Sequence, residues 1–285
     1  MKDLIITKLQ NNIKNTNINK SSYWKKHLPE NIDILNENNF FMFGTFTKKS
    51  LKNNFLDILA RIIFKKHIFK TILYKKIKTV FDYNNRKIDI DTIKHIFTFE
   101  KIKLYHNPKK ICLIGDGKLN GVLSAYLQFP NAKIYSVNLS EVLINDYITL
   151  TKTNINLKNS VDLVDNINFK GKNKLTLVPS NFKEFLFNQD IDLFINIASF
   201  QEMTTDEIDN YFKIIKKNRA KLYCCNRQYK KLYGGEEIYF ERYPFSNSKK
   251  LFWGDCPWYQ KWYSIRPPFI HNYDGNIMHC LVDFN

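Results

Sequence analysis

The residues of this chain whose types and spacing best suit ligand chemistry lie in ICLIGDGKLNG, residues 111–121. Four apolar residues typical of a short buried strand come first, and Gly115, Gly117 and Gly121 follow within seven positions. Glycine permits positive φ values and lets a ligand approach the backbone closely. A helix that starts directly after such a turn presents unpaired N–H groups. The spacing is not the dinucleotide fingerprint G-x-G-x-x-G, so the stretch predicts a ligand-binding turn without naming the ligand.

Further candidate binding residues follow the other strands that the sequence predicts. They are Asn138 and Leu139 after the second strand, Asn181 and Phe182 after the third, Asn196, Ala198, Ser199, Gln201 and Glu202 after the fourth, and Asn226 and Arg227 after the fifth. Parallel strands end at one rim of a sheet, and ligands of open α/β sheets bind at that rim. The convergence of polar groups there strengthens the prediction of a nucleotide-type site that includes Asp116.

The elements that must position these residues alternate between strand and helix from residue 110 onward. Apolar runs predict strands at residues 110–114, 133–137, 175–178, 191–197 and 221–225. Helical spacing predicts helices at 120–129, 141–157 and 206–217, the last with Thr204 as N-cap. Asp274-Gly275 between two apolar stretches predicts a closing antiparallel hairpin. The pattern predicts an α/β fold, a doubly wound Rossmann-like sheet with an antiparallel terminal hairpin.

The first part of the chain has a different texture. Residues 1–107 are predicted to form a mostly helical N-terminal cap region, and residues 108–285 the sheet domain, with an aromatic-rich insertion at about 227–276. Residues 53–81 are typical of one long basic amphipathic helix or two broken ones, and a further helix is predicted at 91–104. We interpret the basic segment as a cap helix with solvated lysines, and its alternative interpretation is a membrane-surface helix.

Composition limits the classes of function. The chain has 285 residues, of which 44% are hydrophobic and 15% aromatic, which is typical of a globular protein. No apolar run of about 18 residues predicts a membrane span, and the N-terminus does not read as a signal peptide. The five cysteines form no CxxC motif, so neither a zinc site nor a disulfide framework is expected, and the predicted location is the cytoplasm.

The net charge of +17 could indicate a polyanionic partner. The excess is nearly all lysine, and Asn, Ile, Phe and Tyr are abundant, as expected from an A/T-rich coding sequence. Because base-reading proteins tend to use arginine forks, a nucleic-acid partner is not favoured.

The order of the predicted elements resembles the class I S-adenosylmethionine-dependent methyltransferases. More narrowly, INIASFQEM after the fourth strand, the YFKIIKK helix, YCCNR with the later ERYPF, and the N-terminal SSYWKKH resemble the bacterial sugar O-methyltransferases. The resemblance runs through most of the chain, and the SFQEM block is its most specific part. It implies S-adenosylmethionine as cofactor, bound by Gly115, Asp116, Gly117, Asn138, Leu139, Asn181, Phe182, Asn196, Ala198 and Ser199.

Two positions depart from the pattern of the class. Leu113 stands where an acidic residue usually precedes the first glycine, and Asn138 stands where a carboxylate usually holds the ribose diol. An asparagine can accept one hydrogen bond and donate another, but it lacks the strength of a charged acceptor. The resemblance therefore predicts a cofactor site whose ribose contact is weakened, or is supported by Asp116 or Glu141.

Methyl transfer to a hydroxyl needs a base that removes the proton. Glu202 is the first candidate, with bracing of Gln201 as its alternative role, and His271 and Asp255 are further candidates. Gln201, Arg227, Arg242, Tyr243 and Trp258 are candidate acceptor-binding residues, because arginine forks grip phosphates or carboxylates and aromatic faces stack on sugar rings. The predicted acceptor is a sugar hydroxyl, nucleotide-activated or part of a surface glycan pathway.

Other interpretations remain open. The same donor site would serve a methyltransferase acting on RNA or on a phosphoryl-type oxygen, although no Pro-Pro-aromatic motif follows the fourth strand. A cofactor-free Rossmann-like interaction module is the non-enzymatic alternative.

Overall fold

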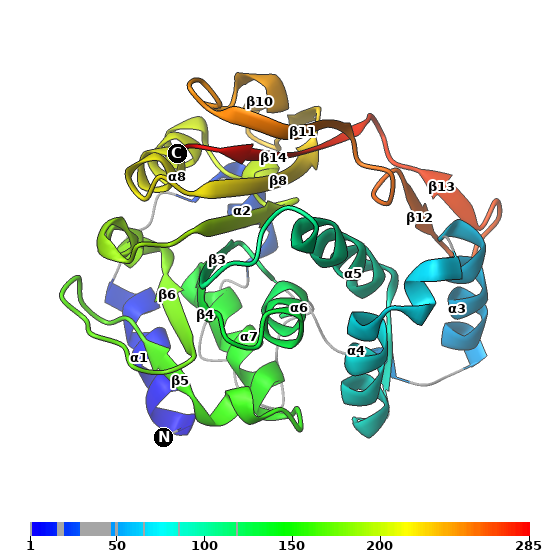
Figure 1. Ribbon diagram of the computed structural model, residues 1–285, viewed down its shortest axis with the longest axis horizontal. Coiled ribbons are helices and arrows are strands. Elements are labelled where there is room, and N and C mark those ends of the chain that lie inside the picture. The colour runs from blue at the N-terminus through cyan, green and yellow to red at the C-terminus, as the bar shows by residue number, and fades with distance from the viewer. Residues whose placement is uncertain are drawn as a thin grey trace.

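The computed structural model describes residues 2–15, 20–28, 47–48, 51–64, 66–84, 86–117 and 119–285. Its centre is an eight-stranded sheet in the order β11-β14-β8-β7-β3-β4-β6-β5 (Figure 1). These strands are Lys249–Asp255, Ile277–Asp283, Lys221–Arg227, Leu193–Ile197, Lys110–Ile114, Lys133–Asn138, Leu175–Pro179 and Val161–Leu163. Strands β3 to β8 pair in parallel, and β14 pairs antiparallel with both β8 and β11. The predicted doubly wound sheet with an antiparallel edge is confirmed.

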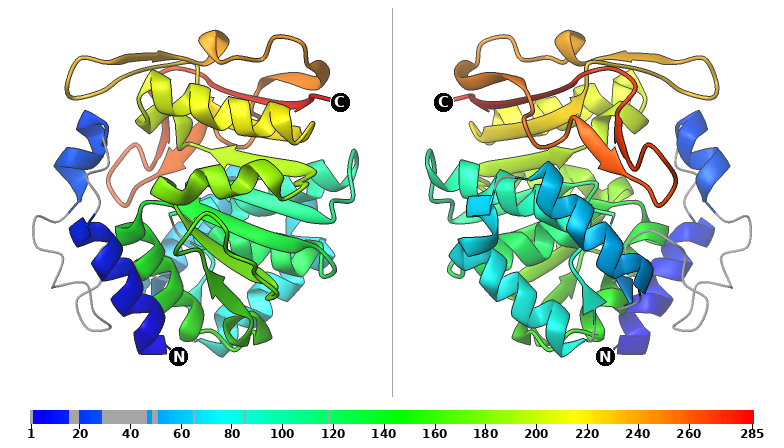
Figure 2. Two further views of the ribbon diagram at one scale, coloured as in Figure 1. Left: turned by 90° about the vertical axis from the view of Figure 1, so that its left-hand side faces the viewer. Right: turned by 90° about the vertical axis from the view of Figure 1, so that its right-hand side faces the viewer.

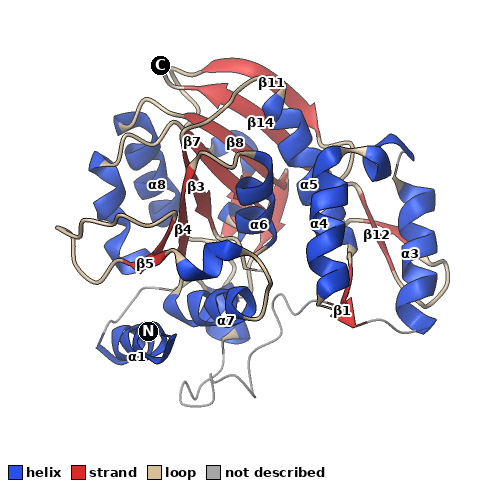
Figure 3. Cartoon of the chain, turned by 60° about the horizontal axis from the view of Figure 1, so that its bottom comes forward, coloured by secondary structure: helices blue, strands red, loops and turns tan. Residues whose placement is uncertain are grey.

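Side-chain alternation along the strands creates two cores, one on each face of the sheet. Ile111 and Leu113 of β3 pack on one face, and Cys112 and Ile114 pack on the other. The first face is covered by α4 (Ile72–Tyr83), α5 (Ile90–Lys103), α6 (Asn120–Gln128) and α7 (Ser140–Thr151). The second face is covered by η4 (Ser180–Asn188) and α8 (Thr205–Lys217), with Thr204 as the N-cap of α8. Figure 3 shows α8 and α6 on opposite sides of the strands. Because strands buried on both faces have no polar side, the predicted apolar runs mark them well.

The predicted hairpin at Asp274-Gly275 is wrong in its pairing. The strand before it, β13 (Ile270–Asn272), pairs with β12 (Lys261–Tyr263), and the strand after it is β14. The antiparallel pair at the sheet edge is instead β11 with β14. Two apolar stretches beside an Asp-Gly turn identify a change of direction, but they do not identify the partner of each strand.

The N-terminal helices reach different parts of the sheet domain. The basic segment forms two pieces, α3 (Leu51–Ile63) and α4, joined by η2 (Lys66–Lys70). Helix α1 (Lys2–Asn15) packs on α7, and Ser140 of α7 donates a hydrogen bond to Asn12 at 2.9 Å. Helix α2 (Ser22–His27) lies against the C-terminal half of the chain, where Ser22 contacts Glu236. Figure 2 shows α1 and α2 along one side of the molecule.

Smaller elements complete the described structure. A short antiparallel pair joins β1 (Thr47–Lys48) to β2 (Arg86–Lys87), and a second joins β9 (Tyr229–Lys231) to β10 (Glu237–Tyr239). Three further single turns are η3 (Asn156–Asn159), η5 (Phe200–Glu202) and η6 (Phe240–Arg242). No helix in the described part of the chain combines the length and the apolar character that crossing a bilayer requires.

Candidate active site

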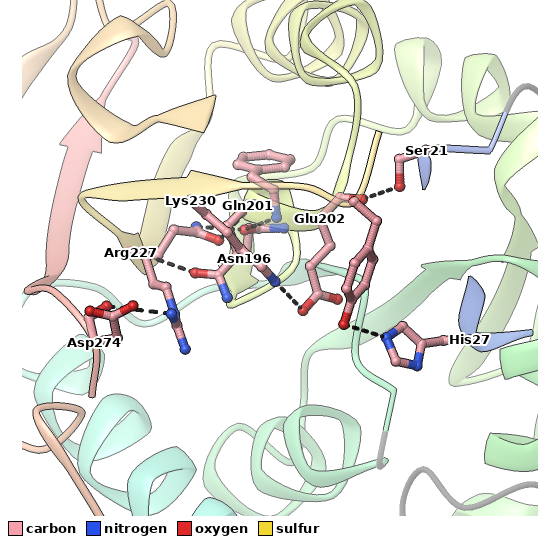
Figure 4. Close-up of polar contacts among 11 residues, drawn as sticks. Ser21, His27, Asn196, Gln201, Glu202, Arg227, Lys230 and Asp274 are labelled. Carbon is pink, nitrogen blue, oxygen red and sulfur yellow. Dashed lines mark hydrogen bonds and ion pairs between the residues drawn. The ribbon is translucent and has the colours of Figure 1, made fainter. Parts of the chain in front are cut away.

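The largest group of predicted site residues surrounds a cavity of about 250 Å³ at the carboxyl ends of β3, β7 and β8. Residues from the N-terminal helices and from the C-terminal third close it. Its walls include Tyr23, Trp24, Asp91, His95, Gly115, Asp116, Gly117, Ala198, Ser199, Gln201, Glu202, Arg227, Tyr259 and Tyr273. The cavity therefore lies at the rim where the sequence predicted a ligand, and Figure 4 shows part of its polar wall.

The glycine turn after β3 is shaped by two different requirements. Gly115 has φ +77°, and a Cβ there would lie 1.9 Å from Oγ of Ser199, so the protein itself needs this glycine. A Cβ on Gly117 would meet only Cγ1 of Val142, at 3.7 Å. Gly117 also lines the cavity. Protein packing therefore does not require a glycine at position 117, and the absence of a side chain there leaves space for a ligand.

Asp116 has a structural task inside this turn. Its Oδ2 accepts a hydrogen bond of 2.7 Å from the backbone N–H of Val122, in the first turn of α6. A Cβ on Gly121 would lie 3.0 Å from the same oxygen, so this glycine lets α6 approach the turn. The carboxylate therefore satisfies an otherwise unpaired helix N–H, while Asp116 still borders the cavity.

A smaller cavity of about 50 Å³ adjoins the first one and shares Ser199 and Trp24 with it. Asn138 lies in its wall, and Oδ1 of Asn138 accepts a hydrogen bond of 3.0 Å from the Leu139 N–H. The Nδ2 of Asn138 and the Oγ of Ser180 are buried and have no hydrogen-bond partner among the described residues. Both residues line the smaller cavity, so these two atoms are available to pair with a polar group placed there.

The amide of Asn196 joins three strands. Its Nδ2 donates to the Ile114 carbonyl at 3.1 Å, and its Oδ1 accepts from Nδ2 of Asn226 at 2.8 Å. Asn196 is fully buried and lines neither cavity, so the structure gives it a framework position. Ala198, at φ +57°, and Ser199 follow β7 and lie beside the glycine turn, where Ser199 faces Gly115.

Gln201 and Arg227 form one polar wall of the main cavity. Oε1 of Gln201 accepts from the backbone N–H of Arg227 at 2.7 Å. The guanidinium of Arg227 donates to the Asp274 carbonyl at 3.4 Å and lies 5.7 Å from the ring centre of Tyr273. Figure 4 shows Gln201, Arg227 and Asp274 in this chain of contacts.

Arg227 also opens onto a second space. An outer cavity of about 580 Å³ is lined by Ile90, Asp91, Arg227, Trp262, Tyr263, Asn272, Tyr273 and Asp274. It shares Asp91, Arg227 and Tyr273 with the main cavity. The two spaces therefore meet at an arginine, a carboxylate and an aromatic ring.

Glu202 lies in the main cavity in a mixed environment. Its Oε1 is 3.0 Å from Nζ of Lys230, and the hydroxyl of Tyr23 donates to the same carboxylate. Burial raises the pKa of Glu202, and the neighbouring Lys230 opposes that rise. A carboxylate with a raised pKa beside a cavity suits proton transfer, although the ion pair with Lys230 also suits a bracing role.

Helix α2 covers the rim, which the sequence did not predict. Ser21 donates to the Glu202 carbonyl at 2.5 Å, and Lys20 pairs with Glu141 at 2.6 Å. Trp24 contacts both cavities. The motif SSYWKKH resembled the family in sequence, but its place over the strand ends depends on contacts across about 180 positions.

Helix α5 supplies two more wall residues that sequence reasoning missed, Asp91 and His95. The adjacent Lys94 is fully buried and donates to the hydroxyl of Tyr273 at 2.8 Å. It also lies 4.8 Å from the ring centre of Tyr259. Asp91, Lys94, His95 and Thr98 are spaced by three or four residues, so they share one side of α5, and this polar side was a signal that the helix meets something other than core.

Several predicted site residues line none of these three cavities. Asp255 lies beside Asn276, His271 stacks on Trp262 at 4.3 Å, and Arg242 lies over Tyr239 at 3.9 Å. Trp258 donates to Thr98 at 3.1 Å, and Tyr243 is buried in the core beneath α8. Asn181 and Phe182 are the second and third residues of η4. The structure thus brings Glu202 together with Gln201 and Arg227, and leaves Asp255, His271, Arg242, Tyr243 and Trp258 outside the cavity walls.

Comparisons with known proteins give similarities of fold. No protein-family model matches the chain, and no curated protein matches its sequence. Similar solved structures include the methyltransferase domain of bacterial CtHen1, with 14% identity, a TM-score of 0.40 and coverage of 68% of this chain and 99% of that chain. M. capricolum TrmK in complex with S-adenosylhomocysteine has 14% identity, a TM-score of 0.38 and coverage of 66% and 68%.

A third similar structure is the plantazolicin methyltransferase BpumL in complex with the same compound, abbreviated SAH, with 12% identity, a TM-score of 0.42 and coverage of 82% and 99%. None of the three is named for a sugar acceptor. At these identities and TM-scores the similarity is one of fold alone.

Proposed function

We propose that this chain is an S-adenosylmethionine-dependent O-methyltransferase. The observation that carries the proposal is the pair of adjoining cavities, in which Gly117, without a side chain, lines the larger space and Asn138, whose Nδ2 is unpaired, lines the smaller. The two cavities offer separate places for the amino-acid part and the nucleoside part of one elongated ligand.

The residues present fit the cofactor, and Asn138 takes the position at which the class usually has a carboxylate. The backbone of residues 115–117 would hold the methionine portion, and Nδ2 of Asn138 would donate to a ribose oxygen. Leu139 and Ser180 border the same small cavity, and Trp24 would cover it. When bound, S-adenosylmethionine supplies an electrophilic methyl group on its sulfonium sulfur.

Glu202 is the proposed base. Its carboxylate lines the main cavity, where an acceptor oxygen must lie about 3 Å from the methyl carbon and in line with the sulfur. It would take the proton of the acceptor hydroxyl as the new C–O bond forms. Lys230, at 3.0 Å, favours the ionised form of the carboxylate and so opposes the effect of burial on its pKa.

The proposed acceptor is a sugar hydroxyl, on a nucleotide-activated sugar or a glycan. The outer cavity supports this because Trp262, Tyr263 and Tyr273 offer aromatic surface and Arg227 offers a charged fork. Aromatic faces pack on sugar rings, and guanidinium groups bind phosphates and carboxylates through paired hydrogen bonds.

A transfer assay tests the proposal. Labelled S-adenosylmethionine would be incubated with the enzyme and a panel of nucleotide sugars, with RNA and a phosphoryl compound as comparators. We expect label on a sugar, and a loss of transfer in Arg227→Ala that exceeds the loss in Arg242→Ala, because only Arg227 lines the cavities. Transfer to RNA instead would reject the sugar acceptor and keep the methyltransferase.

A further inference from the structure

A second surface of the molecule combines exposed apolar side chains with basic charge. On α3, Phe55, Ile58 and Ile62 are 38%, 56% and 66% exposed. The loop between β12 and β13 adds Ile265 and Phe269, at 47% and 37%, and β12 adds Trp262 at 38%. We call these six residues the α3–β12 patch.

The patch is one surface built from two distant parts of the sequence. Positions 55, 58 and 62 lie on one side of a helix, because they are spaced by three and four residues. The rings of Phe55 and Phe269 meet edge to face with centroids 5.5 Å apart, and α3 contacts β12. Figure 1 shows α3 beside β12 and β13, and Figure 3 shows α3 beside β12, in both views at the end of the molecule away from α1.

Such a patch differs from ordinary surface exposure. Leu4, Tyr83 and Leu104 are just as exposed, but each lies on a different helix or at its end. Single exposed apolar residues are normal, whereas contiguous ones mark an interaction surface. The other side of α3 already packs on the protein through Leu59 and Ala60, so the exposed side is available for a second contact.

The charge around the patch identifies the kind of partner. Exposed cations lie on the same segments, at Arg61, Lys70, Lys261 and Arg266. Segments 51–70 and 261–269 together contain seven Lys or Arg residues and a single acidic residue, Asp57. A second copy of the chain would bring the same positive charge to the contact, and nucleic acid has no apolar surface to match six hydrophobic side chains. An anionic lipid surface satisfies both requirements.

We propose that the α3–β12 patch docks this protein on an anionic membrane surface. The apolar side chains would enter the headgroup region and the surrounding lysines and arginines would contact acidic lipids. Trp262 belongs to the patch and also lines the outer cavity, so the cavity would open at the bilayer. The consequence that the acceptor is anchored in or held at the membrane rests on the proposed function, whereas the docking itself does not.

Vesicle binding by the full chain tests the docking. We expect co-sedimentation with vesicles of phosphatidylcholine and phosphatidylglycerol, and much less with phosphatidylcholine alone. The double variant Ile58→Ser, Ile62→Ser should lower the partition coefficient at least tenfold, since burying each isoleucine contributes strongly. Removing the charges of Lys261 and Arg266 with glutamine should cost about fivefold each. The matched control is Tyr83→Ser, Leu104→Ser, which removes equally exposed apolar groups elsewhere and should bind as the wild type does.

A second measurement is independent of the isoleucine variant. Brominated lipid in the vesicles should quench the fluorescence of the wild-type protein through Trp262, and Trp262→Phe should lose most of that quenching. Failure to bind anionic vesicles, or unchanged binding by the isoleucine double variant, would overturn the proposal. Dimerisation abolished by the same double variant would assign the patch to a second copy instead. Because cofactor binding is measured separately, none of these results depends on whether methyl transfer occurs.

Discussion

At the level of single residues, the environment of Glu202 allows two roles to be distinguished by experiment, a general base and a structural support for Gln201. Burial raises the pKa of this carboxyl and Lys230 lowers it, so the two neighbours of one side chain act in opposite directions. A base works in its ionised form, and its rate contribution is therefore lost as the pH falls through its pKa. If Glu202 only braces Gln201, the pH–rate profile should show no such loss of rate at low pH, that is, no acid limb.

We expect Glu202→Gln to reduce turnover by about 10²–10⁴-fold while cofactor affinity changes little. Lys230→Met should move the acid limb of the pH–rate profile to higher pH, because the cation that favours the ionised carboxylate is gone. Lys231→Met is the matched control, since its side chain lies on the next position of β9 and does not pair with Glu202. An acid limb that stays in place in Lys230→Met would assign Glu202 to bracing.

Some wall residues could be predicted from the sequence and others could not. Gly115, Ser199 and Glu202 follow strands directly, so the order of elements was sufficient to place them at one rim. Asp91 and His95 come from a helix that precedes the first predicted strand, and no spacing links them to residue 202. Asp255 and His271 have suitable chemistry, but the pairing of β12 with β13 holds His271 on Trp262.

At the scale of elements, buried helices explain why the N-terminal region matters to the sheet domain. Every residue from Ser140 to Leu150 of α7 is buried, although several are polar. The outer side of α7 is covered by α1, in which Leu9 is fully buried. The sequence of α7 alone has more polar residues than a core helix usually has. Its polar outer side is buried because α1 packs on it.

Leu9→Ala should therefore lower the free energy of unfolding by about 2–5 kcal/mol, as expected for a large core side chain that leaves a cavity. Leu4→Ala changes the same residue type on the same helix, but Leu4 is 57% exposed and should cost less than about 0.5 kcal/mol. Urea denaturation of both variants measures the difference. Equal stabilities would mean that α1 does not pack on α7 in solution.

The predicted strands and helices mostly agree with the structure to within a few residues, because apolar runs and helical periodicity are local signals. The predicted helix at 141–157 ends at Thr151, and the predicted strand at 191–197 begins at Leu193. The pairing of β11 with β14 and the position of α2 over the rim depend on contacts between distant segments, which no local pattern contains.

For the molecule as a whole, the net charge of +17 reflects either a polyanionic partner or the composition of the coding sequence. If the lysine excess reflects coding composition and the α3–β12 patch, RNA should bind weakly, without sequence preference, and with an affinity that falls steeply with salt. Filter binding with unrelated RNA sequences at several salt concentrations checks this. A tight, sequence-selective complex at physiological salt would point to a nucleic-acid acceptor.

If the two adjoining cavities hold S-adenosylmethionine, the product SAH should bind in them, which calorimetric titration measures. We expect saturable binding of one SAH per wild-type chain. Gly117→Val should weaken it at least tenfold at an unchanged unfolding temperature, because a Cβ at Gly117 meets only Val142 at 3.7 Å. Gly254→Val, a glycine on β11 with nothing within 4 Å of its Cβ position, should bind as the wild type does. Absence of binding by the wild-type chain, or an unchanged affinity in Gly117→Val, would mean that these cavities do not hold the cofactor.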